Sequence, residues 1–470
     1  MLLAAKWVLP ITSDPIENGA ILISKDKIKA VGRKRDLIKT HPKETVIDFG
    51  KAILLPGFVD THTHLEYSVF RGMCDDLPFA LWKIQVTKKS KKLSDSDWIS
   101  SAQLGTLEAI QSGITCIADI SSTGASLSTA LLAGLRGAIF CEVSGMDHSK
   151  IDEVVSCARR NVHSWLEQSQ NSHLKIGVSP LGVYTVAPPL FKAVSDWARK
   201  EDIPLCLHLA GSPDEYSFIM YGSSLLATTY RDLMGWSDLL WQPMGVSPVK
   251  YVEQWDVFEG EVIAVHCIQV GERDIDILRK YDVAIAHCPK CSAKLGMGIA
   301  PLRDFIRCGL RVGIGTDSPA SNNTMDIFDE MRTGLLLQRG ASESVEGFSA
   351  EQFVRMATLG GAEVLKMEGE IGSLEEGKQA DIIAVDISHS HQIPVNDPYS
   401  ALVYTTNQEN VIFTMVGGKV LYEKNGYSIL DQEEILACTE PIRKKLKGRS
   451  LESRGYGKHA GSGHGSRGKR

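Results

Sequence analysis

The middle of the chain alternates between short apolar runs and longer stretches in which apolar residues recur every three or four positions. The short runs are rich in β-branched residues and predict eight strands, at 53–64, 114–121, 136–145, 174–182, 204–211, 262–267, 283–289 and 311–317. The amphipathic stretches predict helices between them, including 96–111, 151–168, 189–200, 272–280 and 301–308. Eight strands that alternate with helices favour an α/β fold, in which parallel strands close into a TIM-type (β/α)8 barrel.

The two ends of the chain have a different pattern. Residues 1–52 and 366–440 contain short β-rich runs and turns, but neither segment is long enough to enclose a core alone. We therefore expect both ends to combine into one small β-sandwich domain beside a barrel formed by residues 53–365. Residues 216–259 interrupt the alternation after the fifth strand and contain three tryptophans, which indicates a cap over the substrate.

Residues 441–470 are basic and rich in glycine. Between residues 443 and 470 there are ten lysines and arginines against one acidic residue. We expect a disordered tail here, and the alternative is a basic arm that contacts polyanions. The whole chain has a net charge of −6, so the remainder carries −15, which argues against nucleic-acid binding by the folded part.

The composition is that of an ordinary globular protein, with 43% hydrophobic and 23% charged residues. No stretch reaches the roughly 18 consecutive apolar residues of a membrane-spanning helix. The first ten residues hold a lysine within their apolar run, unlike a secretory signal, so we expect a cytoplasmic protein with no membrane partner. Ten cysteines then predict free thiols, and the single C-x-x-C pair, Cys288 and Cys291, indicates buried thiols rather than a zinc knuckle.

Histidines and one aspartate gather at the ends of the predicted strands. His62 and His64 end the first strand, and residues two apart on a strand point to the same side. Four later strands end in His208, His266, His287 and Asp317. Any one of these histidines is equally consistent with a hydrogen-bonded core position. The whole set, at the barrel face where active sites are built, predicts a metal site.

Several motifs resemble those of the amidohydrolase superfamily, along nearly the whole chain. Residues 56–64 (PGFVDTHTH) resemble its entry motif, and residues 372–381 (GSLEEGKQAD) resemble its return into the β-domain. The segments most similar to the cyclic deaminase and chlorohydrolase branch are 71–77, 287–290, 294–301 and 315–323. Enzymes of that branch deaminate adenosine-like nucleosides (S-adenosylhomocysteine, methylthioadenosine or aminodeoxyfutalosine), guanine or cytosine, or dechlorinate s-triazines.

This resemblance implies a role for each residue at the strand ends. It implies catalytic roles for His266 and Asp317, and a place beside the attacked group for His287. It implies that a divalent metal ion is held by His62, His64, His208 and Asp317. Such an ion would lower the pKa of its bound water towards 7 and supply hydroxide for attack on the ring.

The number and kind of metal ions can also be argued. Binuclear relatives carry a bridging lysine at the end of strand four, but the only lysine of that strand here, Lys175, lies at its beginning. We therefore expect one ion. Three imidazoles and one carboxylate suit Zn²⁺, with Fe²⁺ as the alternative.

The chain departs from the deaminase pattern at residue 211. The deaminases carry a glutamate three residues after the histidine of strand five, where this chain has Gly211. That glutamate protonates the ring nitrogen, and general acids typically contribute about 10²–10⁴-fold to the rate. Asp214, Glu215 and Glu142 are the candidates to replace it, and an enzyme impaired in catalysis is the alternative reading.

Smaller departures concern the substrate pocket. Cys291-Ser292 stands where relatives often carry Ser-Asn, and Leu181-Gly182 where many carry His-Ala. For each pocket candidate, core packing or a turn cap is an equal alternative to ligand contact. The residues expected to contact the substrate are Trp82, Tyr184, Glu215 and His287, with Ser321 as a further candidate.

Together these features predict a metal-dependent hydrolase that deaminates an aromatic N-heterocycle, in the first place an adenosine-like nucleoside. Among enzymes, the alternative is a triazine-type chlorohydrolase or aminohydrolase. From another class, Gly211 favours a metal-binding barrel that holds a heterocycle without turnover. A homodimer is compatible with the acidic body and the tryptophan-bearing insertion.

Overall fold

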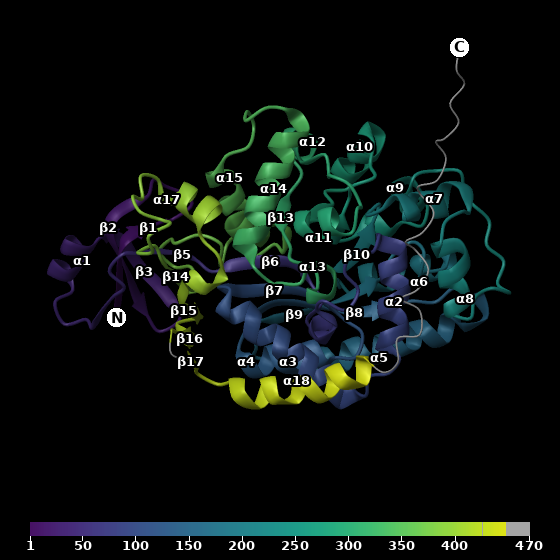
Figure 1. The fold of residues 1–470 in the computed structure, drawn as a ribbon, viewed down its shortest axis with the longest axis horizontal. Coiled ribbons are helices and arrows are strands. Elements are labelled where there is room, and N and C mark those ends of the chain that lie inside the picture. Colours follow the sequence, from purple (N-terminus) through teal and green to yellow (C-terminus); the bar gives the residue numbers. More distant parts are fainter. Residues whose placement is uncertain (425, 448–470) are drawn as a thin grey trace, which may run out of the picture.

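The computed structural model describes residues 1–424 and 426–447. They form a barrel and, at one end of the molecule, a mixed β-sheet built from both ends of the chain (Figure 1). The amidohydrolase-like architecture expected from the sequence, a TIM-type barrel beside a small β-domain, is confirmed.

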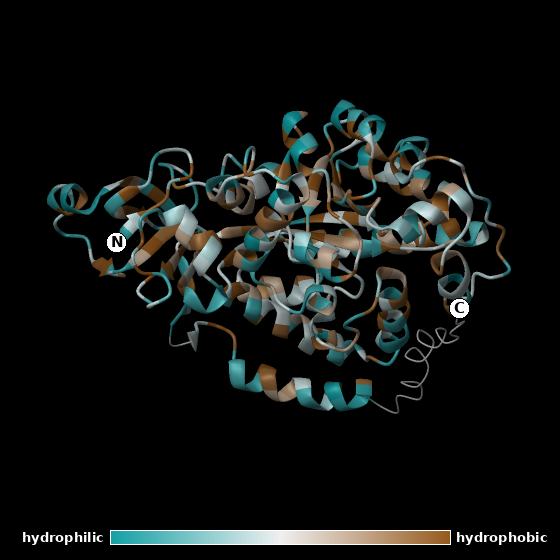
Figure 2. Cartoon of the chain, turned by 45° about the horizontal axis from the view of Figure 1, so that its top comes forward, coloured by the Kyte–Doolittle hydropathy of each residue, from teal (hydrophilic) through white to brown (hydrophobic). Residues whose placement is uncertain are grey.

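The barrel is an eight-stranded parallel sheet with the order β13-β12-β11-β10-β9-β8-β7-β6. Its strands are β6 (Phe58–Thr63), β7 (Ile114–Ser121), β8 (Arg136–Val143), β9 (Leu174–Pro180), β10 (Leu205–Leu209), β11 (Val262–His266), β12 (Ala284–His287) and β13 (Val312–Ile314). The chain beyond β13 returns to β6 through a bridge between Thr63 and Asp317, and the amide of Asp317 donates to the carbonyl oxygen of His62 at 2.8 Å. The strands are buried almost throughout, as expected for a parallel sheet covered by helices (Figure 2).

Helices cover the outside of the barrel and connect its strands. The α-helices are α1 (Lys34–Thr40), α2 (Phe79–Ser90), α3 (Asp95–Gln111), α4 (Ala125–Ala133), α5 (Ile151–Gln168), α6 (Pro188–Lys200), α7 (Pro213–Tyr221), α8 (Arg231–Leu233), α9 (Pro248–Glu253), α10 (Glu272–Lys280), α11 (Pro289–Lys294), α12 (Leu302–Arg307), α13 (Pro319–Asn322), α14 (Ile327–Ser342), α15 (Ala350–Arg355), α16 (Gly361–Val364), α17 (Pro398–Ser400) and α18 (Gln432–Lys447). In α5 the buried Val155, Ala158, Val162 and Trp165 recur every three or four residues, which places one apolar face on the barrel. Among the described residues, no helix combines the length and the apolar character needed to cross a bilayer.

The first predicted strand is divided at Gly57. Ala52–Pro56 (β5) pairs with β1 and β14 of the mixed sheet, so only the second half of the predicted run belongs to the barrel. A Cβ atom at residue 57 would lie 2.1 Å from Oγ1 of Thr115, so the close passage from sheet to barrel requires glycine. The barrel therefore begins at Phe58, later than the expected residue 53.

The mixed sheet draws its strands from both ends of the chain. They are β1 (Leu2–Val8), β2 (Ile16–Ser24), β3 (Lys27–Arg33), β4 (Val46–Asp48), β5 (Ala52–Pro56), β14 (Ile382–Asp386), β15 (Val411–Val416), β16 (Lys419–Glu423) and β17 (Gly426–Tyr427). One apolar core contains Ile28 of β3 together with Ile382 and Phe413 from the other half of the sheet. The sheet thus bends over a core of its own, and a buried ion pair between Arg136 Nε and Asp381 Oδ2, 2.7 Å long, joins it to the barrel.

The end of the described chain differs from the expected tail. Helix α18 continues to Lys447, past the expected start of the tail at residue 441, and lies along α3 (Figure 1). Its Ile435, Ile442 and Leu446 are buried, and Lys445 Nζ pairs with Oδ2 of Asp97 at 2.5 Å. The basic residues therefore form the outer side of a packed helix up to this point. The tail prediction for residues 448–470 lies outside the described residues.

The insertion after the fifth barrel strand covers the mouth of the barrel. It contains α7, α8 and α9 with a π-helical turn at Leu226–Tyr230. The ring of Tyr230 lies 5.8 Å from that of Tyr184, which follows β9. Lys91 Nζ, just after α2, donates to the carbonyl oxygen of Leu233 at 2.9 Å. These contacts agree with the expected position of a cap.

Candidate active site

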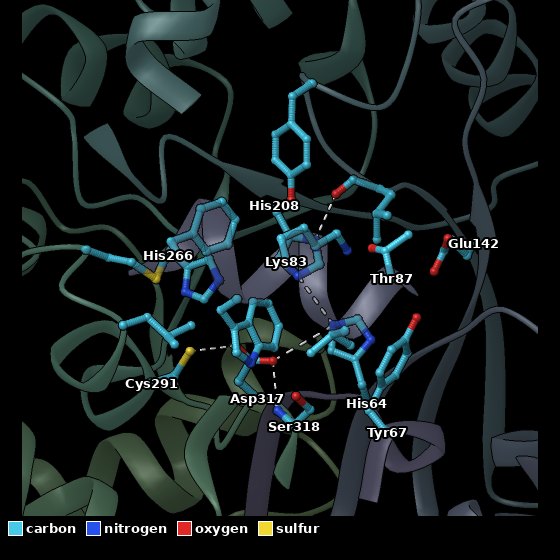
Figure 3. Close-up of a pocket in the computed structure, with 17 residues that line it drawn as sticks. His64, Tyr67, Lys83, Thr87, Glu142, His208, His266, Cys291, Asp317 and Ser318 are labelled. Carbon is cyan, nitrogen blue, oxygen red and sulfur yellow. Dashed lines mark hydrogen bonds and ion pairs between the residues drawn. The ribbon is translucent and has the colours of Figure 1, made fainter. Parts of the chain in front are cut away.

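Three histidines converge at the carboxyl ends of two barrel strands. His62 and His64 come from β6 and the residue after it, and His208 comes from β10. One ring nitrogen from each lies within 4.8 Å of the others. His64 Nε2 is 3.3 Å from His208 Nε2 (Figure 3). The ring centroids of His62 and His208 are 4.9 Å apart. This is the grouping expected of metal ligands.

Backbone carbonyls fix the orientation of two of these rings. His64 Nδ1 lies 3.1 Å from the carbonyl oxygen of Ile120, and His208 Nδ1 lies 2.8 Å from that of Leu181. A carbonyl oxygen only accepts, so each Nδ1 is the donor, and the lone pair of Nε2 faces the cluster. Both ring nitrogens of His62 are buried and have no hydrogen-bond partner among the described residues. A divalent ion would bind one nitrogen of each of the three rings, so the residues present fit the metal that the sequence implied.

Burial favours the neutral form of His64 and His208, which is the form that binds a metal ion. Burial, assisted by the neighbouring His62, lowers the pKa of His64 to about 3. Burial and the other rings hold the pKa of His208 well below its ordinary value. Burial alone would raise the pKa of Asp317, but the nearby rings of His62, His64 and His266 outweigh it and hold that pKa well below the ordinary value. The site therefore combines neutral rings with an ionised carboxylate.

Asp317 lies at the edge of the histidine cluster. Its Oδ1 is 3.7 Å from His62 Nε2 and 4.0 Å from His64 Nε2. His266 completes the group, with its ring 5.6 Å from that of His208. Asp317 and His266 both have positive φ angles, 58° and 77°, a strained backbone conformation that tends to be kept at functional sites. The structure thus brings together the four expected ligands and His266.

Asp60, which the sequence did not single out, helps to position two of these residues. Its buried carboxylate accepts hydrogen bonds from Thr316 N at 3.0 Å, Thr316 Oγ1 at 2.6 Å and His62 N at 3.3 Å. Asp60 therefore ties β6 to the segment after β13, between His62 and Asp317. Asp60 stands two residues before His62 in the same motif, and this position was the sequence signal that could have identified its role.

A pocket opens in front of the metal cluster. Its lining residues are His64, Tyr67, Phe79, Trp82, Lys83, Val86, Thr87, Glu142, Leu181, Tyr184, His208, His266, Cys291, Leu295, Met297, Asp317 and Ser318. Trp82 and Tyr184 line it as expected, and Trp82 Nε1 donates to the carbonyl oxygen of Ala320 at 3.0 Å. Their contact with a substrate stays a prediction.

Three other expected contacts lie elsewhere. Glu215 is turned away from the pocket lining, because its two carboxylate oxygens accept from the amides of Ala210 and Gly211 at 2.7 and 2.9 Å. Ser321 belongs to the capping box of α13, in which Ser318 Oγ accepts from the amide of Ser321 and Ser321 Oγ accepts from the amide of Ser318. His287 lines a smaller cavity of about 200 Å³. The chain enters α11 directly after β12, and this brings Cys291 rather than His287 to the pocket.

Lys83 was not singled out in the sequence, although it lines the pocket. It belongs to α2, in which Phe79, Trp82, Lys83 and Val86 all face the pocket at helical spacing. A lysine within the helically spaced apolar residues Phe79, Trp82 and Val86 was the signal that would have identified it. Burial lowers its pKa, and the negative charges of Glu142 and Asp317 oppose that shift.

Gly211 borders the pocket, next to two of its lining residues. A Cβ atom at this position would lie 3.1 Å from Cδ2 of His266, 3.3 Å from Cε of Met297 and 3.5 Å from Oε2 of Glu215. The first two distances are tighter than a Cβ atom normally makes, so His266 and Met297 would have to shift to admit the acid that the deaminase pattern places here.

Comparison with known proteins gives the chain a family. The amidohydrolase family model matches residues 53–421. A 5-methylthioadenosine/S-adenosylhomocysteine deaminase from Moorella thermoacetica is 31% identical over 432 residues, which cover 92% of this chain and 96% of the relative. The structure superposes on a zinc-bound adenosine deaminase from Xanthomonas campestris with a TM-score of 0.83 and 25% identity, over 95% of this chain and 98% of that one. It shares its fold with an atrazine chlorohydrolase from Arthrobacter aurescens, at a TM-score of 0.79 and 24% identity over 94% and 99% of the two chains. The motifs at the strand ends, the metal-ligand geometry and the match along most of the sequence agree, and the chain belongs to the amidohydrolase family.

Proposed function

We propose that this protein is a zinc-dependent hydrolase that removes the exocyclic amine of an adenosine-like nucleoside. The observation that carries the proposal is the convergence of three imidazoles with the ionised Asp317 on one wall of the pocket. The names of the relatives that match over nearly the whole chain support a nucleoside substrate. One ion is proposed because the described cluster contains a single group of three histidines.

His62, His64, His208 and Asp317 would hold the ion. When bound, it would lower the pKa of a coordinated water towards 7 and so supply hydroxide at neutral pH. Asp317 is ionised, so one of its carboxylate oxygens can take the proton that the attacking water loses. Burial lowers the pKa of His266 to about 4, so this ring acts as a neutral hydrogen-bonding group at the reacting carbon.

The departing amine needs a proton, and Gly211 has no acid to provide it. The carboxyl group nearest to the vacant position is Glu215, whose Oε2 would lie 3.5 Å from a Cβ at residue 211. Burial raises the pKa of Glu215 to about 7, so it can carry a proton near neutral pH. We therefore propose Glu215 as the proton donor, acting after its Oε2 leaves the amide of Gly211 and turns towards the pocket. In the balanced reaction water adds to the ring carbon, the C–N bond breaks, and the amine leaves as ammonia.

The test is ammonia release by the zinc-loaded protein from adenosine, S-adenosylhomocysteine, methylthioadenosine, guanine and an aminotriazine, with Gly211→Glu and Glu215→Gln in parallel. Release by the unmodified chain that falls at least about 10²-fold in Glu215→Gln supports the proposal, because positioned acids contribute on this scale. Release only after Gly211→Glu shows an intact site without a donor and overturns the role of Glu215. If no variant releases ammonia, the deaminase proposal is overturned, and the remaining hypothesis is a metal-binding barrel that holds a heterocycle without turnover.

Two further measurements separate the remaining alternatives. Chloride release from a chlorotriazine, without ammonia release from nucleosides, identifies the chlorohydrolase reaction. Elemental analysis of protein purified without added metal, followed by reconstitution with Zn²⁺ or Fe²⁺, distinguishes the two ions. The cytoplasmic location and the homodimer stay predictions from the sequence.

A further inference from the structure

Two oppositely charged side chains line the pocket beyond the metal cluster. Lys83 extends from α2, and Glu142 lies near the end of β8. Among the described residues, neither side chain has a hydrogen-bond or ion-pair partner. Both are only partly exposed, so each has lost much of its water without gaining a protein partner. Polar groups that face a pocket in this state are available to a ligand.

Lys83 and Glu142 lie at different distances from His266 at the reacting region, and Glu142 is the farther of the two. Figure 3 shows Glu142 beyond Thr87, on the other side of the pocket from His266 and Cys291. Figure 3 also places Lys83 between these two sides of the pocket. A heterocycle whose reacting carbon faces His266 would therefore direct a ring substituent towards Lys83 and Glu142.

Thr87 adds a third polar group to this wall. It follows Lys83 by four residues on α2, which places the two side chains on the same face of the helix. The wall thus offers a donor at Lys83, a donor and acceptor at Thr87, and an acceptor at Glu142. We define Lys83, Thr87 and Glu142 as the polar wall.

Resting on the proposed function, we propose that the polar wall binds the neutral hydroxyl-bearing substituent of the substrate, a ribose-type sugar, and so selects a nucleoside over the free base. Each sugar hydroxyl both donates and accepts, so it can pair with every member of the wall: its O–H with Glu142, its oxygen with Lys83. The wall carries one positive and one negative charge, which favours a neutral polar group over a group with net charge. Transfer of a fully charged tail into this half-closed pocket would cost more desolvation than transfer of a sugar.

The test compares adenosine with adenine in the wild type, Glu142→Gln and Lys83→Met. Both substitutions keep the size of the side chain while removing its charge. Loss of a charged hydrogen-bond partner is expected to lower kcat/KM for adenosine about 10–100-fold, mainly through KM, with kcat/KM for adenine changed less than about 3-fold. Matched controls are Lys88→Met, on the exposed side of the same helix, and Glu153→Gln, on the exposed side of α5. Both controls should keep the wild-type preference for adenosine over adenine.

A binding measurement separates this inference from the proposed function. Calorimetric titration with inosine and hypoxanthine needs no turnover, and only inosine binding should weaken in Glu142→Gln and Lys83→Met. If inosine binding shows this dependence while no amine is released from any substrate, the polar wall stands and the deaminase is overturned. Equal losses of affinity for inosine and hypoxanthine, or no loss for either ligand, overturn the proposed role of the polar wall. An effect seen with S-adenosylhomocysteine but absent with adenosine would show that the wall recognises a charged tail, and also overturns it.

Discussion

The thiol of Cys291 donates a hydrogen bond to Oδ2 of Asp317 at 2.8 Å. The other carboxylate oxygen, Oδ1, accepts from the amide of Ser318 at 2.7 Å. The orientation of the Asp317 carboxylate is therefore fixed from both sides before any ligand binds. The sequence predicted that Cys288 and Cys291 are buried thiols, which both are, and the structure adds that one of them supports an expected metal ligand.

Because groups that orient metal ligands contribute to metal affinity, Cys291→Ala should weaken zinc binding about 10-fold. Cys291→Ser keeps a hydroxyl donor and should stay within about 3-fold of the wild type by the same reasoning. Competition with a chromophoric chelator measures both constants, and Cys308→Ala, distant from the pocket lining, is the control. Wild-type affinity in Cys291→Ala would show that the thiol contact does not position Asp317.

Removal of one imidazole from the cluster should abolish stable metal binding. His208→Ala leaves two histidines and Asp317, one ligand fewer than the four proposed for this site, and it removes the nitrogen that lies 3.3 Å from His64 Nε2. Zinc at 100 times its dissociation constant should stabilise the wild type by about 2.7 kcal/mol and leave His208→Ala unchanged. Elemental analysis and thermal unfolding with added zinc measure the two effects. His163→Ala, on the exposed side of α5, should behave as the wild type, and a zinc-dependent shift retained in His208→Ala would contradict the assignment.

His287 should make the fold sensitive to mild acid. Burial, then the charge of His266, lowers the pKa of His287 to about 4, and its Nε2 has no partner among the described residues. In the unfolded chain the pKa is about 6.5, so between these values the unfolded state binds the proton and stability falls as pH falls. From pH 7 to pH 5 the wild type should lose about 2 kcal/mol more than His287→Gln. Urea unfolding at the two pH values tests this, with the exposed His148→Gln as control, and parallel losses in all three proteins would refute it.

The sequence predicted regular elements well where the pattern is local. Helices α5 and α10 were expected at their observed bounds because a single apolar face defines each. The division at Gly57 depends on Thr115, more than fifty residues away, so the apolar run on either side carried no sign of it. The packing of α18 depends on α3 in the same way, and its basic composition concealed the buried Ile442.

The active site was also predictable only where a pattern along the chain marks the residues. Strand ends identified the histidine cluster, because alternation and barrel topology bring these positions together. The direction of an individual side chain was not predictable. A glutamate that follows a strand can face the pocket, or its carboxylate can accept hydrogen bonds from the backbone amides of the preceding turn. Glu215 does the second, while Lys83, which no motif marks, faces the pocket.

The bond between Asp60 and Thr316 makes barrel closure and metal binding interdependent. Thr316→Val would remove the hydroxyl that donates to Oδ2 of the fully buried Asp60, and no solvent can replace it there. A buried acceptor left without its partner costs about 1–3 kcal/mol, so the free energy of unfolding should fall by that amount. Because Asp60 also accepts from the amide of His62, the same variant should bind zinc more weakly, whereas Thr316→Ser should restore both properties. Urea unfolding and chelator competition on the two variants provide the measurement. If Thr316→Val lost stability but kept wild-type zinc affinity, the closure of the barrel at this point would be independent of the metal site, and Asp60 would serve the fold alone.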